Sequence, residues 1–260
     1  PSAAGELEYC FKHGLAQETV YLSMLPAKRR KMHLRVAEAI EALFAERLHE
    51  FYGELSYHFN QGADFEKAEA YMLKAGDEAM QISASHEALN YYKTALELYI
   101  KKRGEAVERP KIAELEENIA LAFFNRRHFV EAVNYFERSL KNYGVKRYTH
   151  PVLVSAGLLF NLARIVKSLY LPSFAKKRPP SEQDLRIMNL KFKLAMALSY
   201  VDINRVFVDN IRNVPPSFKR DIRNAPVYVD ALIGAGALFA VTGLSFPLSR
   251  RLLDYVDRRV

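Results

Sequence analysis

Cys10 and His13 are the two residues of this sequence whose types and spacing best suit covalent chemistry. A cysteine thiolate can act as a nucleophile, and a histidine within reach can activate it. A spacing of three residues would place both side chains on one face of a helix. No third residue that would orient the histidine is indicated, so a cysteine hydrolase is disfavoured and we predict no catalytic residues. A single cysteine also excludes a disulfide framework and is typical of a reducing cytosol, so we expect a cytoplasmic protein.

The histidines could do a second kind of chemistry, which is metal binding. They form no HExxH motif and no paired ligand spacing, and they stand at His13, His33, His49, His58, His86, His128 and His150. We therefore predict no metal site. The GxxxxGK[ST] loop that cradles nucleotide phosphates is missing as well, so we expect no cofactor in these residues. His33 stands beside Arg29, Arg30 and Lys31, which favours a solvated basic helix face.

Positive charge is concentrated in the second half of the chain. The net charge is +8; residues 1–143 carry 19 Lys and Arg against 22 Asp and Glu, whereas residues 144–260 carry 19 against 8. The densest cluster is Lys176-Lys177-Arg178, inside a Pro-rich loop predicted over residues 171–183. A basic half can attract nucleic acid or an anionic membrane surface, or it can dock on an acidic neighbouring domain. The charge by itself leaves these three open.

The elements that position these residues are predicted to be helices throughout. Alternating strand patterns are missing, and apolar residues recur at steps of three and four. Residues 52–76 repeat a pattern of small and large side chains, with Leu55 and Phe59 before a turn at residues 62–64 and Ala68, Met72 and Ala75 after it. Related patterns place Ala88, Tyr92 and Ala95; Ile119, Ala120, Phe123, Ala132, Phe136 and Ser139; Ala156, Gly157 and Phe160; and Ala235, Gly236, Phe239, Leu248, Leu252 and Tyr255.

Small residues at these steps let two helices cross closely, as the tetratricopeptide repeat of about 34 residues requires. We therefore predict an all-α, tetratricopeptide-like superhelix, an irregular α-solenoid built from helical hairpins. Such an array is typical of a protein that binds other proteins.

One apolar run could instead be a membrane span, because residues 231–249 carry no charged side chain. A span needs roughly 20 apolar residues. Gly243 and Pro247 interrupt the run, and we predict a helix that ends near Thr242, a turn, and a second helix. A second apolar stretch, residues 158–170, precedes the basic loop; the pair could be an interfacial membrane anchor or a buried helix followed by a loop.

Residues 9–43 resemble the segment that joins the ATPase module to the tetratricopeptide region in bacterial multidomain signalling ATPases of the STAND type. The residues that carry this resemblance are Phe11, His13, Leu15, Glu18, Tyr21, Leu25, Arg29, Arg30, His33 and Ala37. Residues 55–79 and 178–200 are also similar to that family. Many of its members are fused to class III adenylate or guanylate cyclase domains.

The resemblance implies that these residues belong to a longer protein, as does the lack of an initiator methionine. It implies that residues 1–47 join an absent upstream module, that residues 48–143 form repeats, and that residues 144–260 form divergent repeats. His13 would sense ATP or ADP in the intact parent only. The sequence departs from the family at His13-Gly14, where His-Ala is usual.

The function that we expect from the sequence is a non-catalytic interaction and signal-relay scaffold. Its partner would be a protein, a peptide or another domain of the same chain, held in a groove lined by the first helices of successive hairpins. Candidate groove residues are Asn118, Asn125, Asn161 and Arg164. The alternative is a nucleic-acid-binding or membrane-peripheral α-solenoid that uses the basic half and the loop at Lys176, Lys177 and Arg178.

Overall fold

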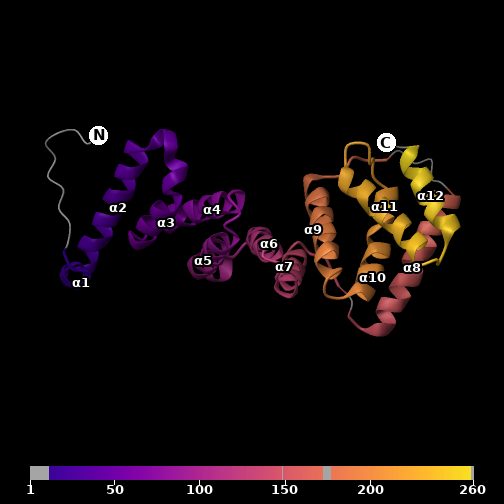
Figure 1. Ribbon diagram of the computed structural model, residues 1–260, viewed down its shortest axis with the longest axis horizontal. Coiled ribbons are helices and arrows are strands. Elements are labelled where there is room, and N and C mark those ends of the chain that lie inside the picture. Colours follow the sequence, from indigo (N-terminus) through magenta and orange to yellow (C-terminus); the bar gives the residue numbers. More distant parts are fainter. Residues whose placement is uncertain (1–11, 148, 172–176, 259–260) are drawn as a thin grey trace. The chain divides into compact units, whose positions relative to one another are not determined.

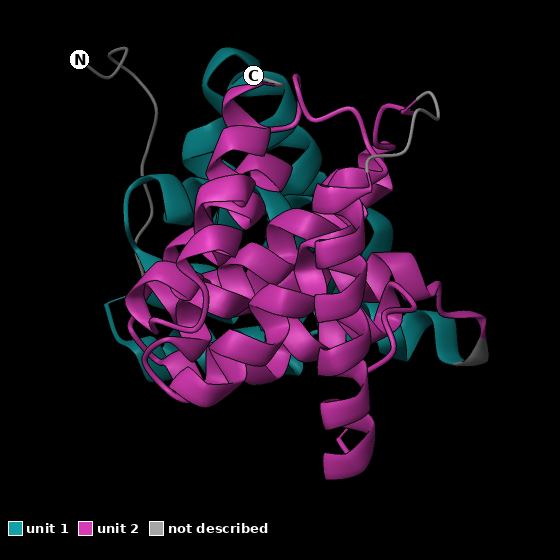
Figure 2. Ribbon diagram, turned by 90° about the vertical axis from the view of Figure 1, so that its right-hand side faces the viewer, with its two compact units in different colours: residues 1–104 teal, residues 105–260 magenta. Residues whose placement is uncertain are grey.

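The computed structural model of this chain describes residues 12–147, 149–171 and 177–258. Within these ranges every regular element is a helix, and the β-type pairing is limited to one isolated bridge between Arg178 and Arg220. The predicted all-α fold of helical hairpins is therefore confirmed. The chain divides into two compact units, residues 1–104 and 105–260, coloured separately in Figure 2. The boundaries predicted near residues 47 and 143 stay a prediction.

Unit 1 is a series of helices in which each packs on the next from α2 onward. Figure 1 follows them from indigo to magenta. They are α1 (Gly14–Ser23), α2 (Pro26–Leu43), the 3-10 helix η1 (Ala45–Phe51), α3 (Tyr52–Gln61), α4 (Phe65–Gln81) and α5 (Ser85–Arg103). A short 3-10 turn, η2 (Gly104–Ala106), follows α5.

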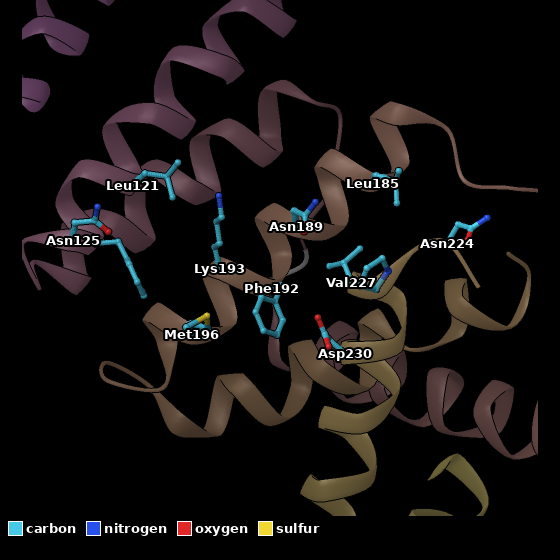
Figure 3. A pocket seen from close by; sticks show the side chains of 12 residues that line it. Leu121, Asn125, Leu185, Asn189, Phe192, Lys193, Met196, Asn224, Val227 and Asp230 are labelled. Atoms are coloured by element: carbon cyan, nitrogen blue, oxygen red, sulfur yellow. The ribbon is translucent and has the colours of Figure 1, made fainter. Parts of the chain in front are cut away.

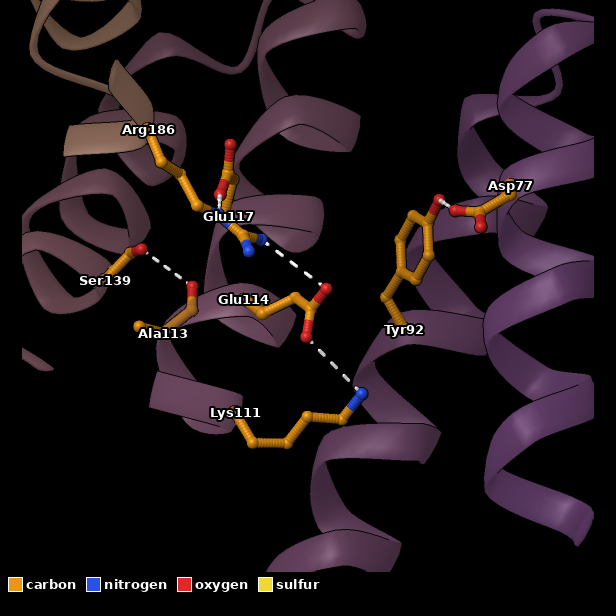
Figure 4. Close-up of polar contacts among 8 residues, drawn as sticks. All are labelled: Asp77, Tyr92, Lys111, Ala113, Glu114, Glu117, Ser139 and Arg186. Carbon is orange, nitrogen blue, oxygen red and sulfur yellow. Dashed lines mark hydrogen bonds and ion pairs between the residues drawn. The ribbon is translucent and has the colours of Figure 1, made fainter. Parts of the chain in front are cut away.

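The core of unit 1 lies where the helices face one another, at the positions that the periodicity predicts. The predicted residues of α3, α4 and α5 are all buried, namely Leu55, Phe59, Ala68, Met72, Ala75, Ala88, Tyr92 and Ala95. A Cβ added at Gly76 would lie 2.5 Å from Cε1 of Tyr92. Helices α4 and α5 therefore approach to a separation that glycine permits. The Tyr92 hydroxyl donates a hydrogen bond of 2.7 Å to Asp77 across the same contact (Figure 4).

The turns between hairpin helices share one backbone conformation. A residue with positive φ follows α3, α4 and α6 (Arg109–Asn125), and these residues are Ala63 (φ 63°), Ser83 (φ 62°) and Arg127 (φ 60°). After each, the next N–H donates to a carbonyl five residues earlier: Asp64 to Phe59, Ala84 to Ala79 and His128 to Phe123, at 2.7–3.0 Å. This is the Schellman closure of a helix. The same turn therefore closes three helices. The sequence does not show this repeat, because the residue with positive φ is not glycine in any of the three turns.

Unit 2 contains three hairpins and one additional helix. Its elements are α6, α7 (Phe129–Asn142), α8 (Pro151–Tyr170), α9 (Glu182–Leu198), α10 (Ile203–Asn213), the 3-10 helix η3 (Pro215–Phe218), α11 (Pro226–Val241) and α12 (Phe246–Asp257). Helix α6 pairs with α7, α9 with α10, and α11 with α12; α9 also packs on α7 and on α11. The buried cluster of the last hairpins includes Ile165, Met188, Ile211, Leu232, Phe239 and Leu252.

Helix α8 is outside this succession of hairpins, which corrects one prediction. Ala156 and Phe160 were expected at a close helix crossing, but both are exposed, and the Phe160 side chain is 63% exposed. Helix α9 packs against α7 instead, and α8 packs on α10, α12 and η3. The reason is that α8 is apolar on most of its circumference, so periodicity does not define which face is buried. Only Ile165 of α8 is fully buried.

The apolar run at residues 231–249 forms two helices, as predicted. Helix α11 ends at Val241, Gly243 takes φ 68° in the turn, and α12 begins at Phe246. Ala235, Gly236 and Phe239 are buried, together with Leu252 of α12. Within the described residues, the one helix long and apolar enough to cross a membrane is α8, with a mean hydropathy of 1.6 over a window that is 6% buried.

Candidate partner groove

A hollow of about 590 Å³ lies between α6, α9 and α11, the first helices of the three hairpins of unit 2 (Figure 3). Its wall is largely apolar, with polar side chains spaced along it. The lining residues are Leu121, Phe124, Asn125, Leu185, Asn189, Phe192, Lys193, Met196, Asn224, Pro226, Val227 and Asp230. We call this hollow the α6–α9–α11 groove.

Helix α9 supplies the floor of the groove because it has two apolar faces. Its core face buries Met188, Leu194 and Leu198. Its other face presents Phe192 and Met196, whose side chains remain 41% and 44% exposed. An exposed aromatic side chain beside an exposed methionine on one helix is an apolar surface that suits a partner rather than solvent.

The start of α9 is fixed by local hydrogen bonds. Ser181 accepts a bond from the N–H of Asp184, and Asp184 accepts one from the N–H of Ser181, at 3.1 and 3.0 Å. This capping box sets the first turn of the helix. Arg220 pairs with the same Asp184 carboxylate at 2.7 Å, which ties the start of α9 to the segment before α11. The rotation of α9, and with it the direction of Phe192, is thereby set.

Ion pairs hold α6 against α9, and a hydrogen bond joins α7 to α6 (Figure 4). Arg186 of α9 pairs with Glu117 at 2.9 Å and with Glu114 at 3.5 Å, both on α6. The Ser139 hydroxyl of α7 donates a hydrogen bond of 2.7 Å to the Ala113 carbonyl of α6, within the α6–α7 hairpin. A groove wall held in this way changes little when a ligand enters, so less binding free energy is lost to ordering.

The polar groups of the groove suit a peptide main chain. Asn125, Asn189 and Asn224 each carry an amide that can donate and accept, which matches the alternating N–H and C=O groups of a backbone. Lys193 and Asp230 contribute opposite charges, so the lining is formally neutral. Figure 3 shows the labelled side chains on the three helices and the segment before α11.

The structure separates the four residues predicted for a groove. Asn125 lines the α6–α9–α11 groove, whereas Asn118, two turns earlier on α6, is half-buried and does not line it. Asn161 and Arg164 lie together on α8 and line a different hollow. The Asn161 amide donates a hydrogen bond of 2.8 Å to the Gly157 carbonyl. That these four contact a partner stays a prediction.

Sequence reasoning missed the α9 residues of the groove. Residues 185, 189, 192, 193 and 196 follow steps of three and four, the signal that marks one helix face. The signal was available, but the second apolar face of α9 masks it. A helix with apolar residues on two sides does not show in its sequence which side meets the core.

The remaining predicted site residues are scattered. His13 is exposed at the start of α1, where its carbonyl accepts a hydrogen bond from the N–H of Ala16, and it does not line the α6–α9–α11 groove. Lys177 donates to the Tyr255 hydroxyl and lies over that ring, 4.8 Å from its centre. The carbonyl of exposed Arg178 accepts the N–H of Asp221 at 2.9 Å. Lys176 and Cys10 lie outside the described residues.

His33 corrects another expectation. It was placed on a solvated helix face, but its side chain is only 9% exposed, because α3 covers it. Its ring contacts Tyr21, Tyr57 and His58. As for metals, no group of three or more His, Cys, Asp or Glu in the part of the chain that the structure describes could hold an ion.

Comparison with known proteins gives low-identity structural neighbours. No family model matches the chain, and no curated protein matches it. BtubC (BKLC) from P. vanneervenii is 16% identical, with 91% of each chain covered and a TM-score of 0.46. The Q17M form of the nearly identical TPR-like repeats of a putative kinesin light chain from Podosopora anserina is 11% identical, covering 90% of this chain and 94% of that one, with a TM-score of 0.41.

Proposed function

We propose that this chain is a non-catalytic interaction module that holds a peptide segment of a partner protein in the α6–α9–α11 groove. The observation that carries the proposal is the groove itself: exposed Phe192 and Met196 flanked by three asparagine amides. The apolar side chains supply most of the binding free energy, about 25 cal/mol per Å² of apolar surface removed from water. The amides fix the position of the peptide backbone.

The groove also indicates what kind of segment binds. Its formal neutrality gives no preference for a strongly charged peptide, whereas its volume of about 590 Å³ accommodates a large side chain together with adjoining backbone. We therefore expect a segment with an aromatic or long aliphatic anchor seated against Phe192. Side chains of this kind dominate the affinity of protein interfaces.

The test starts with selection of peptides from a displayed random library on the full chain. The selected peptides should share an aromatic or aliphatic anchor, and Asn189→Ala and Phe192→Ala should each weaken their affinity at least ~10-fold, which is about 1.4 kcal/mol. Both side chains point out of the core, so the variants should melt as the parent does. Asn161→Ala on α8 is the matched control. Selected peptides whose affinities survive both groove substitutions would exclude this groove as the site.

The wider context follows from the resemblance at residues 9–43. We place this module in a signalling ATPase, in which occupancy of the groove would shift the ATPase or cyclase between inactive and active arrangements. Support comes from His13, which is exposed at the start of α1 and so accessible to a nucleotide-binding domain. The reading frame around this segment is expected to encode a phosphate-binding loop upstream. A frame without one would remove this context and leave the groove untouched.

Nucleic acid is a weaker candidate partner than protein, because many arginines of the basic half pair within the chain. Arg147, Arg186, Arg205, Arg220 and Arg223 all form ion pairs with carboxylates. Each pair lowers the positive charge available to a phosphate backbone, which supplies most of the non-specific affinity for nucleic acid. If the chain is retained on DNA or RNA at about 0.15 M salt, nucleic acid becomes a stronger candidate partner than protein.

A second candidate function is attachment to a membrane surface through α8. One stripe of this helix is apolar and exposed along its length, formed by Val152, Ala156, Leu159, Ala163, Val166 and Tyr170. Leu159 is 67% exposed. A buried helix of a water-soluble core does not leave such a stripe uncovered. Basic residues near its C-terminal end, Lys167 and Arg251, can contact anionic headgroups; Arg251 lies over the Tyr170 ring at 4.0 Å.

Flotation with vesicles that contain anionic lipid tests this candidate. Leu159→Glu should release the protein from the vesicles, because it places a charge within the exposed stripe. Val130→Glu on α7 replaces a valine that is 57% exposed and is the matched control. Flotation that does not change with Leu159→Glu, or no flotation of the parent chain, would exclude attachment through α8.

A further inference from the structure

A set of cationic side chains surrounds two adjoining hollows on the other side of α9. The hollows measure about 640 and 860 Å³. Both are lined by the same six residues: Arg147, Thr149, Lys191, Arg205, Asp209 and Arg212. These come from the connection after α7, from α9 and from α10, so residues far apart in sequence converge on one place. We call this place the Lys191 cavity; it shares no lining residue with the α6–α9–α11 groove.

The charges in the Lys191 cavity do not balance. Arg147 pairs with Glu137 at 2.5 Å, and Arg205 pairs with the same carboxylate and lies 3.7 Å from Asp209. Three carboxylates line the two hollows, Glu137, Asp202 and Asp209, against nine cationic side chains that include Lys191 and Arg212. Arg212 also donates to the Lys146 carbonyl. Cationic side chains therefore outnumber carboxylates in the lining of the two hollows.

Lys191 is one of these cations. Among the described residues, no hydrogen-bond or ion-pair partner reaches its ammonium group, although the side chain is partly buried. Burial lowers the pKa of Lys191 below its usual range, Arg212 lowers it further, and Asp209 opposes both. A buried cation without a partner is costly. Natural proteins keep such a group where a ligand supplies the missing charge.

The lining of the smaller hollow also includes apolar side chains. They are Leu153, Val154, Leu158 and Phe160 of α8 and Val208 of α10, and α8 adds the polar Asn161 and Arg164. A ligand that fills the hollow therefore needs an anionic group at one end and an apolar body at the other. Guanidinium groups match the geometry of phosphate oxygens, and a phosphate dianion matches the predominantly cationic lining.

We propose that the Lys191 cavity is a binding site for an organic phosphate, with the phosphate held by Lys191, Arg147 and Arg212 and the apolar body against Leu158 and Phe160. This site is independent of the proposed peptide groove. The volume of each hollow is in the range that encloses a small-molecule ligand.

The test uses three probes with one aromatic body, namely phenyl phosphate, phenol and phenyltrimethylammonium, titrated calorimetrically into the full chain. Phenyl phosphate should bind at one saturable site that weakens as salt is added, and the neutral and cationic probes should not compete with it. Lys191→Met should lower its affinity at least ~10-fold. Lys193→Met, two residues along on the groove side of α9, should leave it unchanged.

Folding of the variant is checked independently. Methionine matches the length of the lysine stem and needs no charge partner, so Lys191→Met should melt at a temperature at or above that of the parent. Equal binding by the parent and Lys191→Met would overturn the proposal. So would equal binding of phenol, or no saturation below about 1 mM phenyl phosphate. None of these outcomes bears on the peptide groove, which Phe192→Ala tests separately.

Discussion

Nδ1 of His33 on α2 lies 2.9 Å from Nδ1 of His58 on α3, and Nε2 of His33 lies 2.9 Å from the Tyr21 hydroxyl. Two Nδ1 atoms can share a hydrogen bond only when one carries a proton and the other does not. Burial lowers the pKa of both rings; His58 and Arg29 add to the effect on His33, and Glu54 opposes it on His58. Protonation of the accepting ring removes the bond.

Acid is therefore expected to destabilise unit 1. Because both histidine pKa values are lower in the folded chain, their contribution is complete above about pH 6.5 and is lost as the pH falls through the folded values. In His58→Gln the amide oxygen can still accept a hydrogen bond from a protonated His33. The melting temperature of this variant should therefore fall less than that of the parent between about pH 7.5 and pH 5. His86→Gln, at an exposed position, is the control and should behave like the parent. Equal losses in His58→Gln and the parent would contradict this role.

The close approach of α4 and α5 predicts the effect of Gly76→Ala. The added Cβ would lie 2.5 Å from Tyr92, whose hydroxyl is held by Asp77, so the ring cannot move without losing that bond. We expect a loss of about 1–3 kcal/mol in the free energy of unfolding. Gly157→Ala on α8, where no atom lies within 4 Å of the new Cβ, should instead stabilise by up to about 1 kcal/mol. Urea unfolding of both variants measures the difference, and a neutral Gly76→Ala would show that the helices can separate.

Positive φ predicts opposite effects at two positions. Gly243 has φ 68° with open space around it, so Gly243→Ala should cost about 1 kcal/mol through backbone strain alone. Ala63 has φ 63° in the turn after α3, so Ala63→Gly should stabilise by a similar amount. Both are read from denaturant midpoints. Destabilisation by Ala63→Gly would show that side-chain packing, rather than φ, decides stability at this turn.

Glu116 is a buried carboxylate whose partners can be removed one at a time. Glu116 is 1% exposed and forms an ion pair with Arg138 at 2.6 Å. It also accepts a hydrogen bond of 2.7 Å from the Asn142 amide. Burial raises its pKa despite both partners. Arg138→Leu should cost about 2 kcal/mol at neutral pH, because it leaves a buried charge short of a partner.

The pH dependence identifies the cause. Without Arg138 the pKa of Glu116 rises further, so the loss should shrink as the carboxyl group protonates in acid and be largest above its folded pKa. The double variant Arg138→Leu with Glu116→Gln should recover most of the loss. Arg223→Leu, which breaks an exposed pair with Asp221, should leave the free energy of unfolding unchanged. A loss by Arg138→Leu that is constant with pH would assign it to packing instead.

Local sequence information was sufficient for the hairpins. The burial of Leu55, Phe59 and Ala68, and the break between α11 and α12 at Gly243, follow from periodicity and turn residues within about ten positions. These features depend on contacts close in the chain, so the residues that cause them can be read directly. The same holds for the α9 cap, where Ser181 and Asp184 are three residues apart.

Only the tertiary structure decided which helix packs next to α7, which histidine is buried and which lysine has no partner among the described residues. Helix α8 is apolar nearly all round and α9 on two sides, so neither sequence shows which face meets the core; the long-range packing of α9 on α7 and α11 settles it. Lys191 and Lys193 are both lysines on one helix, two residues apart. The two side chains line different hollows, and that difference exists only once residues distant in the sequence, such as Arg147 and Asp230, are brought beside them.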